Sequence, residues 1–220
     1  MARLTTKELI LKKATDLFYR YGYSNTPIRK ITEKVGVENP VIYYYFKSKD
    51  HLLFAIIESI ADDLIGGLQE IIDRVPDPVE RVREMIFFHI TILERKKKPV
   101  KVFVEDNDKL PPKLRMMIKE KEKQIYHLYH TQFELLVEKG MARDIEIPLI
   151  TFSLIGMINW IYRWFKDGGS LDVRGVADRT ISILFSGVII EPGKSDQTAS
   201  APVNGLCAVP GSTNGGESPV

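Results

Sequence analysis

Repeated helix start signals in the first fifty residues constrain the fold more than any other feature of this sequence. Thr5-Thr6-Lys7-Glu8 has the pattern of a capping box, in which the threonine and glutamate satisfy end amides of a helix. Thr26-Pro27 and Asn39-Pro40 each place a capping residue before a proline, which is favoured at the first helical position. Ser48 is a fourth start signal. Because apolar residues at helical spacing follow these signals, the sequence predicts helices over about residues 5–21, 26–35, 39–46 and 48–71.

The remaining sequence continues with helical signals and contains no convincing sheet. Residues 100–106 alternate locally as a strand would, but no partner strand is visible, so a short helix or turn is the better prediction. The apolar run 149–162 carries no charge, yet it is too short to span a bilayer and suits a buried helix. The sequence therefore predicts an all-α fold of about nine helices, the later ones over about residues 77–98, 112–140, 149–166 and 172–190.

Charge and composition indicate where a polyanion would bind. Residues 1–50 hold ten Lys and Arg against five Asp and Glu, whereas the rest of the chain has a net charge of −3. A basic head on a mildly acidic body favours a nucleic-acid partner at one end. The single cysteine, Cys207, excludes an internal disulfide framework. The first residues lack the apolar core of a signal peptide, so we expect a cytoplasmic protein.

The tight link Gly36-Val37-Glu38 joins two short helices, which is the geometry of a helix-turn-helix. In that motif the second short helix enters the DNA major groove. On helix 39–46, Ile42 and Phe46 lie four residues apart and can pack on the first helix. The adjacent tyrosines Tyr43 and Tyr44 must then project outward, where their hydroxyls can donate to phosphate oxygens.

The segment TPIRKITEKVGVENPVIYYYFKSKDHLL, residues 26–53, resembles the DNA-binding segment of the tetracycline-repressor (TetR) family of bacterial transcription regulators. The resemblance is specific over about residues 5–60. This chain departs from many members at Glu38 and Pro40, and Val41 replaces a common hydroxyl residue, so it offers only apolar contact. Carried over residue by residue, the resemblance implies phosphate contacts by Thr26, Tyr43, Tyr44 and Lys49. It implies positions near base edges for Arg29, Asn39, Pro40, Val41 and Tyr45.

Two of these roles have structural alternatives. Tyr45 can pack between helices instead of contacting DNA. Thr26 can be a helix cap, although a cap can also hold a phosphate.

The resemblance also implies a division of the chain and a mechanism. Residues 1–50 would form the DNA-binding domain and residues 51–190 a helical ligand-binding and dimerisation domain. Residues 191–220 are rich in Gly, Pro, Ser and Ala and are expected to be a disordered tail. A homodimer built on the last two helices would bind double-stranded operator DNA as a repressor. A small-molecule effector bound within residues 77–166 would release it.

The apolar stripe of the last helix is expected to take part in that dimer. It comprises Ile181, Leu184, Phe185 and Val188, and the alternative is that it packs only inside its own subunit.

A small-molecule-modifying enzyme or carrier of all-α fold is the rival hypothesis. The sequence has no glycine-rich phosphate loop and no nucleophile elbow, so we expect no enzyme and no cofactor. His127, His130 and Glu134 share one helical face, but such spacing is common without a metal, and no metal site is predicted. His89 either faces a ligand cavity or is hydrogen-bonded in the core.

The stretch GMINWIYRWFKDGGSL, residues 156–171, is similar to TetR regulators of fatty-acid, sterol or aromatic-acid breakdown that sense acyl-CoA thioesters. An acyl-CoA is therefore the expected effector. Its chain would lie among Phe87, Phe88, Met117, Phe133 and Met157. Its phosphates would meet Arg163 with Lys166, and its adenine would stack on Trp160 or Trp164. Alternatively, both tryptophans pack in the dimer interface and Arg163 pairs with an acid there.

Overall fold

Nine α-helices carry the fold among the residues that the structure, a computed structural model, describes: 4–165, 168–169 and 171–189. In this part of the chain the only extended pairing is a β-bridge between Ala142 and Ile189, so the predicted all-α class is confirmed. The tail predicted over 191–220 lies outside the described residues, as does Lys166. The helices are α1 (Thr6–Tyr21), α2 (Ile28–Val35), α3 (Asn39–Tyr45), α4 (Lys49–Arg74), α5 (Pro78–Arg95), α6 (Lys97–Asp106), α7 (Pro112–Glu138), α8 (Ile147–Trp164) and α9 (Val173–Val188), with a 3-10 turn at Asn107–Lys109.

Side-chain caps start α1, α4 and α5 as the sequence predicts. The Thr5 hydroxyl accepts from the Glu8 amide at 3.3 Å, and the Glu8 carboxylate accepts from the Thr5 amide at 2.8 Å. Ser48 accepts from the amide of His51 at 3.3 Å, and Asp77 accepts from the amide of Glu80 at 2.7 Å. Asp172 likewise accepts from the amide of Gly175 at 2.8 Å at the start of α9, so local side chains fix where four of the described helices begin.

The predicted caps Thr26 and Asn39 are wrong in detail. Helix α2 has Pro27 at its N-cap position without a side-chain bond, and α3 begins at Asn39 itself. The Thr26 hydroxyl instead donates to the Gly22 carbonyl at 2.9 Å, so it closes the loop after α1. Asn39 places its side-chain oxygen 3.1 Å from the hydroxyl of Thr32. Both side chains thus bond to neighbouring segments instead of capping the start of a helix.

The expected helix 77–98 also needs correction, because α5 ends at Arg95 and α6 already begins at Lys97. Pro99 lies in the first turn of α6, where a missing amide proton breaks no helical hydrogen bond. The alternating segment 100–106 is therefore helical, as the short-helix alternative stated.

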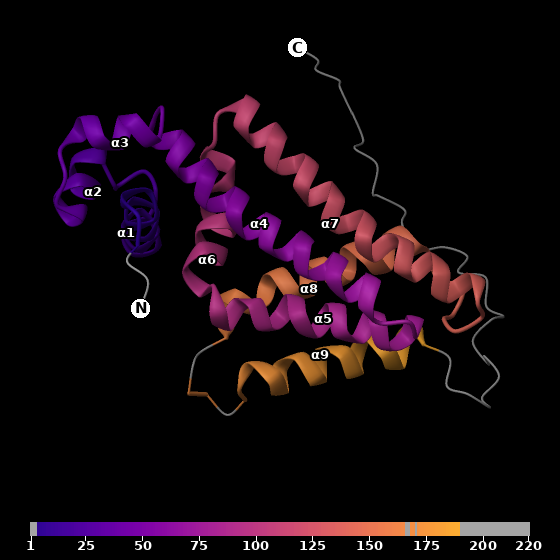
Figure 1. The fold of residues 1–220 in the computed structure, drawn as a ribbon. Helices are drawn as coiled ribbons and strands as arrows, with labels where there is room; N and C mark the ends of the chain where they lie inside the picture. Colours follow the sequence, from indigo (N-terminus) through magenta and orange to yellow (C-terminus); the bar gives the residue numbers. More distant parts are fainter. Residues whose placement is uncertain (1–3, 166–167, 170, 190–220) are drawn as a thin grey trace, which may run out of the picture.

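Two hydrophobic clusters lie along α4, the long helix that runs from α1, α2 and α3 to the other helices in Figure 1. The first contains Ile42 of α3 and Phe46, the residue that follows α3, and both are buried there as predicted. Other members come from α1, α2, the first half of α4, α6 and α7. The second lies between the rest of α4 and helices α5, α7, α8 and α9. Because α4 has 26 residues, it extends for about 39 Å and connects the two clusters rigidly. The first cluster also contains Ile57 of α4, Val102 of α6 and Ile118 of α7.

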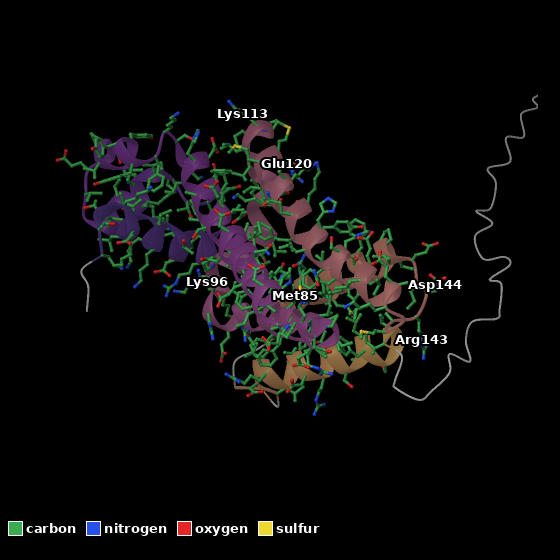
Figure 2. All side chains as sticks on the ribbon, turned by 45° about the vertical axis from the view of Figure 1, so that its right-hand side comes forward. Met85, Lys96, Lys113, Glu120, Arg143 and Asp144 are labelled. Atoms are coloured by element: carbon green, nitrogen blue, oxygen red, sulfur yellow. The ribbon has the colours of Figure 1, made fainter. Side chains whose placement is uncertain are left out.

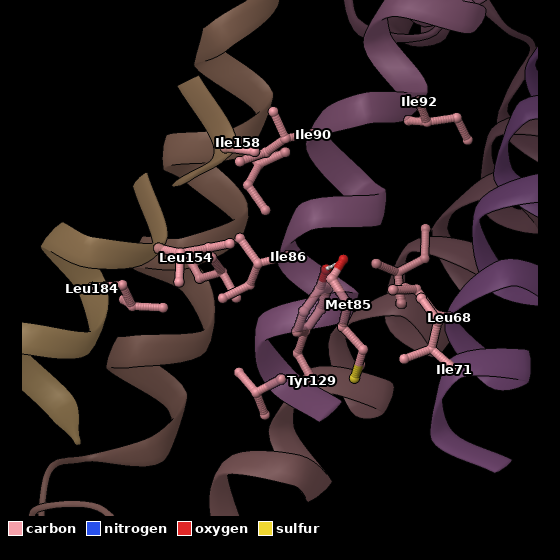
Figure 3. Close-up of a cluster of buried hydrophobic side chains, with 14 of the residues drawn as sticks. Leu68, Ile71, Met85, Ile86, Ile90, Ile92, Tyr129, Leu154, Ile158 and Leu184 are labelled. Atoms are coloured by element: carbon pink, nitrogen blue, oxygen red, sulfur yellow. Dashed lines mark hydrogen bonds between the residues drawn. The ribbon is translucent and has the colours of Figure 1, made fainter. Parts of the chain in front are cut away.

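The apolar stripe of α9 packs inside its own chain, which corrects the expectation that it lies in a dimer interface. Ile181, Leu184 and Val188 are buried, and Figure 3 shows Leu184 directed toward Leu154 of α8 and Ile86 of α5. Phe185 is half-buried beneath the guanidinium of Arg83, which lies 4.8 Å from the ring centroid. The helical spacing correctly predicted that these side chains share one face of α9, but the helix that covers this face is mainly α5 of the same chain.

The far end of the body is closed by the turn after α7. Figure 2 shows Arg143 and Asp144 there, at the opposite end from helices α1 to α3, whereas Lys96 lies between the two ends. The Arg143 amide donates to the Val188 carbonyl at 2.8 Å and ties this turn to the end of α9. No helix in the described part of the chain is long and apolar enough to cross a bilayer.

Candidate nucleic-acid interface and ligand cavity

Helix α3 presents a row of tyrosines to solvent. Its Ile42 side chain is fully buried, whereas Tyr43, Tyr44 and Tyr45 are 53, 82 and 37% exposed. The rings of Tyr44 and Tyr45 meet edge to face at a centroid distance of 4.9 Å. Because the inward face of α3 already supplies the core contact, these phenol rings remain available to a partner.

The turn between α2 and α3 requires glycine. Gly36 has φ +82° in the left-handed region, where a β-carbon is unfavourable. Its amide donates to the Thr32 carbonyl at 2.8 Å, and the Val37 amide donates to the same oxygen at 3.1 Å. These two hydrogen bonds to one carbonyl end α2 sharply. The chain then turns so that α3 leaves in another direction, as in a helix-turn-helix.

Basic side chains flank α3. The Lys49 ammonium lies 4.1 Å from the ring centroid of Tyr23, whose hydroxyl bonds to the Asp50 carboxylate. Burial is the main cause that lowers the pKa of Lys49, and the nearby Asp50 and Asp106 oppose that shift. On α2, exposed Arg29 places its Nε 3.2 Å from the Glu33 carboxylate. Such an exposed pair is weak and can exchange for a phosphate.

Eight of the nine residues predicted to contact DNA reach the surface of this unit. Asn39 and Pro40 are exposed at the start of α3, and Val41 is half-buried beside them. Thr26 is the exception, because its side chain is fully buried and bonded to backbone. Its predicted side-chain contact with phosphate therefore does not fit this structure.

An apolar cavity of about 190 Å³ lies in the body. Its polar groups are few: His89 and Tyr126, with Glu122 and Asn159 in exposed positions. Burial is the largest cause of the raised pKa of Glu122, while Arg115 and Lys119 oppose it. The remaining lining is Ile60, Ala61, Leu64, Ile92, Val100, Phe103, Val104, Ile125, Phe152, Ile155 and Ile158, which come from α4 through α8.

His89 both faces this cavity and bonds within the core, so the two alternatives weighed from the sequence hold together. Its Nδ1 lies 3.2 Å from the Tyr129 hydroxyl, which donates to the Met85 carbonyl at 3.1 Å. Figure 3 shows Tyr129 beside Met85 inside the hydrophobic cluster. Burial lowers the pKa of His89 to about 4 and raises that of Tyr129, so both are neutral near pH 7.

None of the five residues predicted to surround the acyl chain lines this cavity, which corrects that part of the prediction. Phe88 packs on α4 instead, where a β-carbon on Gly67 would come within 2.1 Å of its ring. Phe87 lies beside it, Phe133 is buried in the core, and Met157 is half-buried against the core. Met117 is exposed on α7. Hydrophobicity identified these residues, but it does not tell which helical face each one occupies.

Trp160, Arg163 and Trp164 lie near the end of α8 and do not line the cavity. Trp160 and Arg163 line a second hollow with Asn159 and Val104, two residues that also line the cavity. The Arg163 guanidinium lies 5.3 Å from the Trp160 ring centroid. Trp164 is 50% exposed and lines neither space.

A third hollow adjoins the second on the side of α1. It shares Glu105, Tyr162 and Arg163 with the second hollow. Its further lining is Tyr19 of α1, Lys97 and Lys101 of α6, and Phe165. The three spaces are therefore neighbours with shared lining residues; the first is mainly apolar, and the third contains Lys97, Lys101 and Arg163 with one acid, Glu105.

Comparison with known proteins identifies the family. The model described as "Tetracyclin repressor-like, C-terminal domain" matches residues 75–188, and "Bacterial regulatory proteins, tetR family" matches residues 10–56. The chain belongs to the TetR family. It is thus a ligand-responsive, DNA-binding transcription regulator and not an enzyme.

Individual relatives agree with this assignment. The transcriptional repressor KstR2 of Mycobacterium tuberculosis is 23% identical over 83% of this chain and 92% of its own length. The transcriptional activator FasR of Mycolicibacterium smegmatis is 21% identical over 81% of each chain. The structure of AibR in complex with isovaleryl coenzyme A and operator DNA superposes with TM-score 0.77 at 26% identity, covering 83% of this chain and 100% of AibR.

One of the two histidines of α7, His130, pairs with a carboxylate. His130 Nδ1 lies 3.4 Å from the Glu134 carboxylate, and His127 is exposed one turn earlier. Within the described ranges, no group of three His, Cys, Asp or Glu could hold a metal ion.

Proposed function

We propose that this TetR regulator is a homodimeric repressor that releases its operator when it binds a short-chain or single-ring acyl-CoA. The observation that carries the DNA-binding half is the outward row Tyr43, Tyr44 and Tyr45 on α3, opposite a fully buried Ile42. With α3 in the major groove, Asn39, Pro40 and Val41 meet base edges at its N-terminal end. Tyr43, Tyr44 and Lys49 bind the flanking phosphates.

The homodimer is supported by one face of α8. Leu149, Phe152, Trp160 and Trp164 recur at helical spacing on that face, and each is at least half exposed. Such a contiguous apolar face is typical of a protein interface. A two-fold axis beside α8 would present two copies of α3 to half-sites about 34 Å apart. A regulator that binds the chromosome in this way works in the cytoplasm.

The acyl-CoA is supported by the apolar cavity and the two hollows next to it. A cavity of about 190 Å³ is slightly larger than an engineered apolar cavity of ~150 Å³ that binds benzene. It therefore suits a short or single-ring acyl group and excludes a whole sterol. The thioester would pass Asn159 into the second hollow, and the phosphates would meet Arg163 and Lys101. Isovaleryl coenzyme A in AibR is an acyl-CoA of this size class.

Helix α6 is the element through which the effector would act. Val100, Phe103 and Val104 line the cavity on one side of α6. On the other side, Val102 is buried in the N-terminal cluster and Lys98 pairs with Asp16 of α1. An effector that displaces α6 therefore also displaces α1 and changes the spacing of the two DNA-binding units. The proposal includes the division into a DNA-binding domain, residues 1–50, and a ligand-binding and dimerisation domain, residues 51–190.

A gel shift with promoter DNA from the neighbouring genes tests the function. We expect the protein to retard this DNA and short acyl-CoAs to release it, whereas the corresponding free acids do not. Arg163→Ala should weaken the response to acyl-CoA without weakening DNA binding. Met116→Ala, which changes an exposed side chain of α7, is the matched control. Release by free acids as readily as by thioesters would contradict the acyl-CoA assignment.

A further inference from the structure

The hydrogen bonds of His89 determine which of its ring nitrogens carries the proton. The Tyr129 hydroxyl donates its single proton to the Met85 carbonyl, because a carbonyl oxygen can only accept. The same hydroxyl lies 3.2 Å from His89 Nδ1. Tyr129 must therefore accept this second bond, and Nδ1 must be the protonated nitrogen of His89.

The other nitrogen is then an acceptor that opens into the cavity. Burial keeps the pKa of His89 near 4, so the ring is neutral and Nε2 has a free lone pair. His89 has one hydrogen-bond partner, Tyr129, which engages Nδ1. In the described part of the chain no side-chain nitrogen or oxygen is both fully buried and unpaired. Nε2 is therefore not sealed in the core, and His89 lines the cavity.

We infer that His89 determines effector specificity, because its Nε2 accepts a hydrogen bond from a hydroxyl or amide N–H on the group inside the apolar cavity. This inference rests on the proposed function, since it specifies the chemistry of the same effector. A ligand with only a carbonyl or ether oxygen at that position would leave two acceptors facing each other. A plain hydrocarbon group would leave Nε2 without any partner.

Rigid support makes His89 selective. The imidazole stacks on the Tyr129 ring at a centroid distance of 5.9 Å, and Tyr129 is itself fully buried. The ring therefore cannot simply rotate to offer Nδ1–H to an acceptor without losing the bond to Tyr129. Of the other polar side chains that line the cavity, Tyr126 is half-buried and its hydroxyl can donate as well as accept, whereas Glu122 and Asn159 occupy exposed positions. His89 is the acceptor in its buried part.

Two isomers test this inference directly. p-Cresol and anisole have the same atoms and nearly the same volume, but only p-cresol can donate a hydrogen bond. We would measure both dissociation constants for the full chain by calorimetry without DNA at pH 7.5. The preference for p-cresol over anisole is the ratio of the two dissociation constants. This preference should be five- to tenfold greater in the wild type than in the His89→Phe variant, which is the factor expected for one hydrogen bond.

Tyr129→Phe provides a second test that does not depend on folding of the His89 variant. Without the hydroxyl, the imidazole proton can occupy either nitrogen, so the preference for p-cresol over anisole should fall. Both variants should still bind toluene, which needs only the cavity. An unchanged p-cresol-to-anisole ratio in the variants would overturn the inference, and so would failure of all three probes to bind. Operator binding by the same preparations, measured by gel shift, tests the proposed function independently.

Discussion

Burial of a neutral histidine predicts how the stability of this protein depends on pH. The folded-state pKa of His89 is about 4, whereas an unfolded histidine has a pKa of about 6.5. Between these values the unfolded chain binds one more proton than the folded chain, so stability falls as the pH is lowered from about 6.5. A difference of about 2.5 pKa units corresponds to roughly 3 kcal/mol of unfolding free energy near pH 4.

Urea unfolding followed by circular dichroism from pH 7.5 to 4.5, at one fixed protein concentration, measures this effect. Carboxylates also titrate at the acid end, so the quantity of interest is the difference between the wild type and His89→Gln. The variant should be less stable at pH 7.5, because its amide replaces the imidazole and loses the well-fitted hydrogen bond to Tyr129. It should nevertheless lose less stability on acidification, and the two curves should converge as the pH approaches 4.5. Parallel curves over the whole range would refute the reasoning that His89 is buried in its neutral form.

Three further predictions concern the turn, the phosphate contacts and the dimer. Gly36→Ala should destabilise the protein by about 1 kcal/mol, because Gly36 has φ +82°; thermal unfolding measures this, and an unchanged midpoint would contradict the need for glycine. Lys49→Ala should reduce the slope of log affinity against log salt by about one unit; an unchanged slope in anisotropy titrations would remove Lys49 from the phosphate contacts. Phe152→Asp should convert a dimer to a monomer, because Phe152 is 65% exposed on the apolar face of α8; light scattering that shows the same mass for variant and wild type would reject that face as the interface.

The DNA-binding unit could be predicted from sequence because local signals specify it. The capping side chains, Gly36, and the four-residue spacing of Ile42 and Phe46 act within a helix or a single turn. Thr26 was misassigned as a cap because its hydroxyl bonds to the carbonyl of Gly22 across a loop. A sequence motif alone does not distinguish that tertiary bond from a cap.

The ligand cavity could not be predicted in the same way. Phe87, Phe88 and His89 are consecutive on α5, yet only His89 lines the cavity, because Phe88 lies against Gly67 of α4. That choice depends on where α4 crosses α5, which periodicity does not specify. The prediction that the apolar stripe of α9 lies in a dimer interface was wrong for the same reason. An apolar helix face can pack on a helix of its own chain, here α5, as well as on a partner chain.

The tyrosines of α3 offer the most direct test of the account. Fluorescence anisotropy with labelled promoter DNA would compare the wild type with Tyr44→Ala, and Met116→Ala would be the control. Tyr44 is 82% exposed, so its removal should leave the unfolding midpoint unchanged and weaken DNA binding by at least tenfold. Met116→Ala should bind DNA as the wild type does. Wild-type affinity in Tyr44→Ala, and likewise in Tyr43→Ala, would contradict the claim that the outward face of α3 binds the operator.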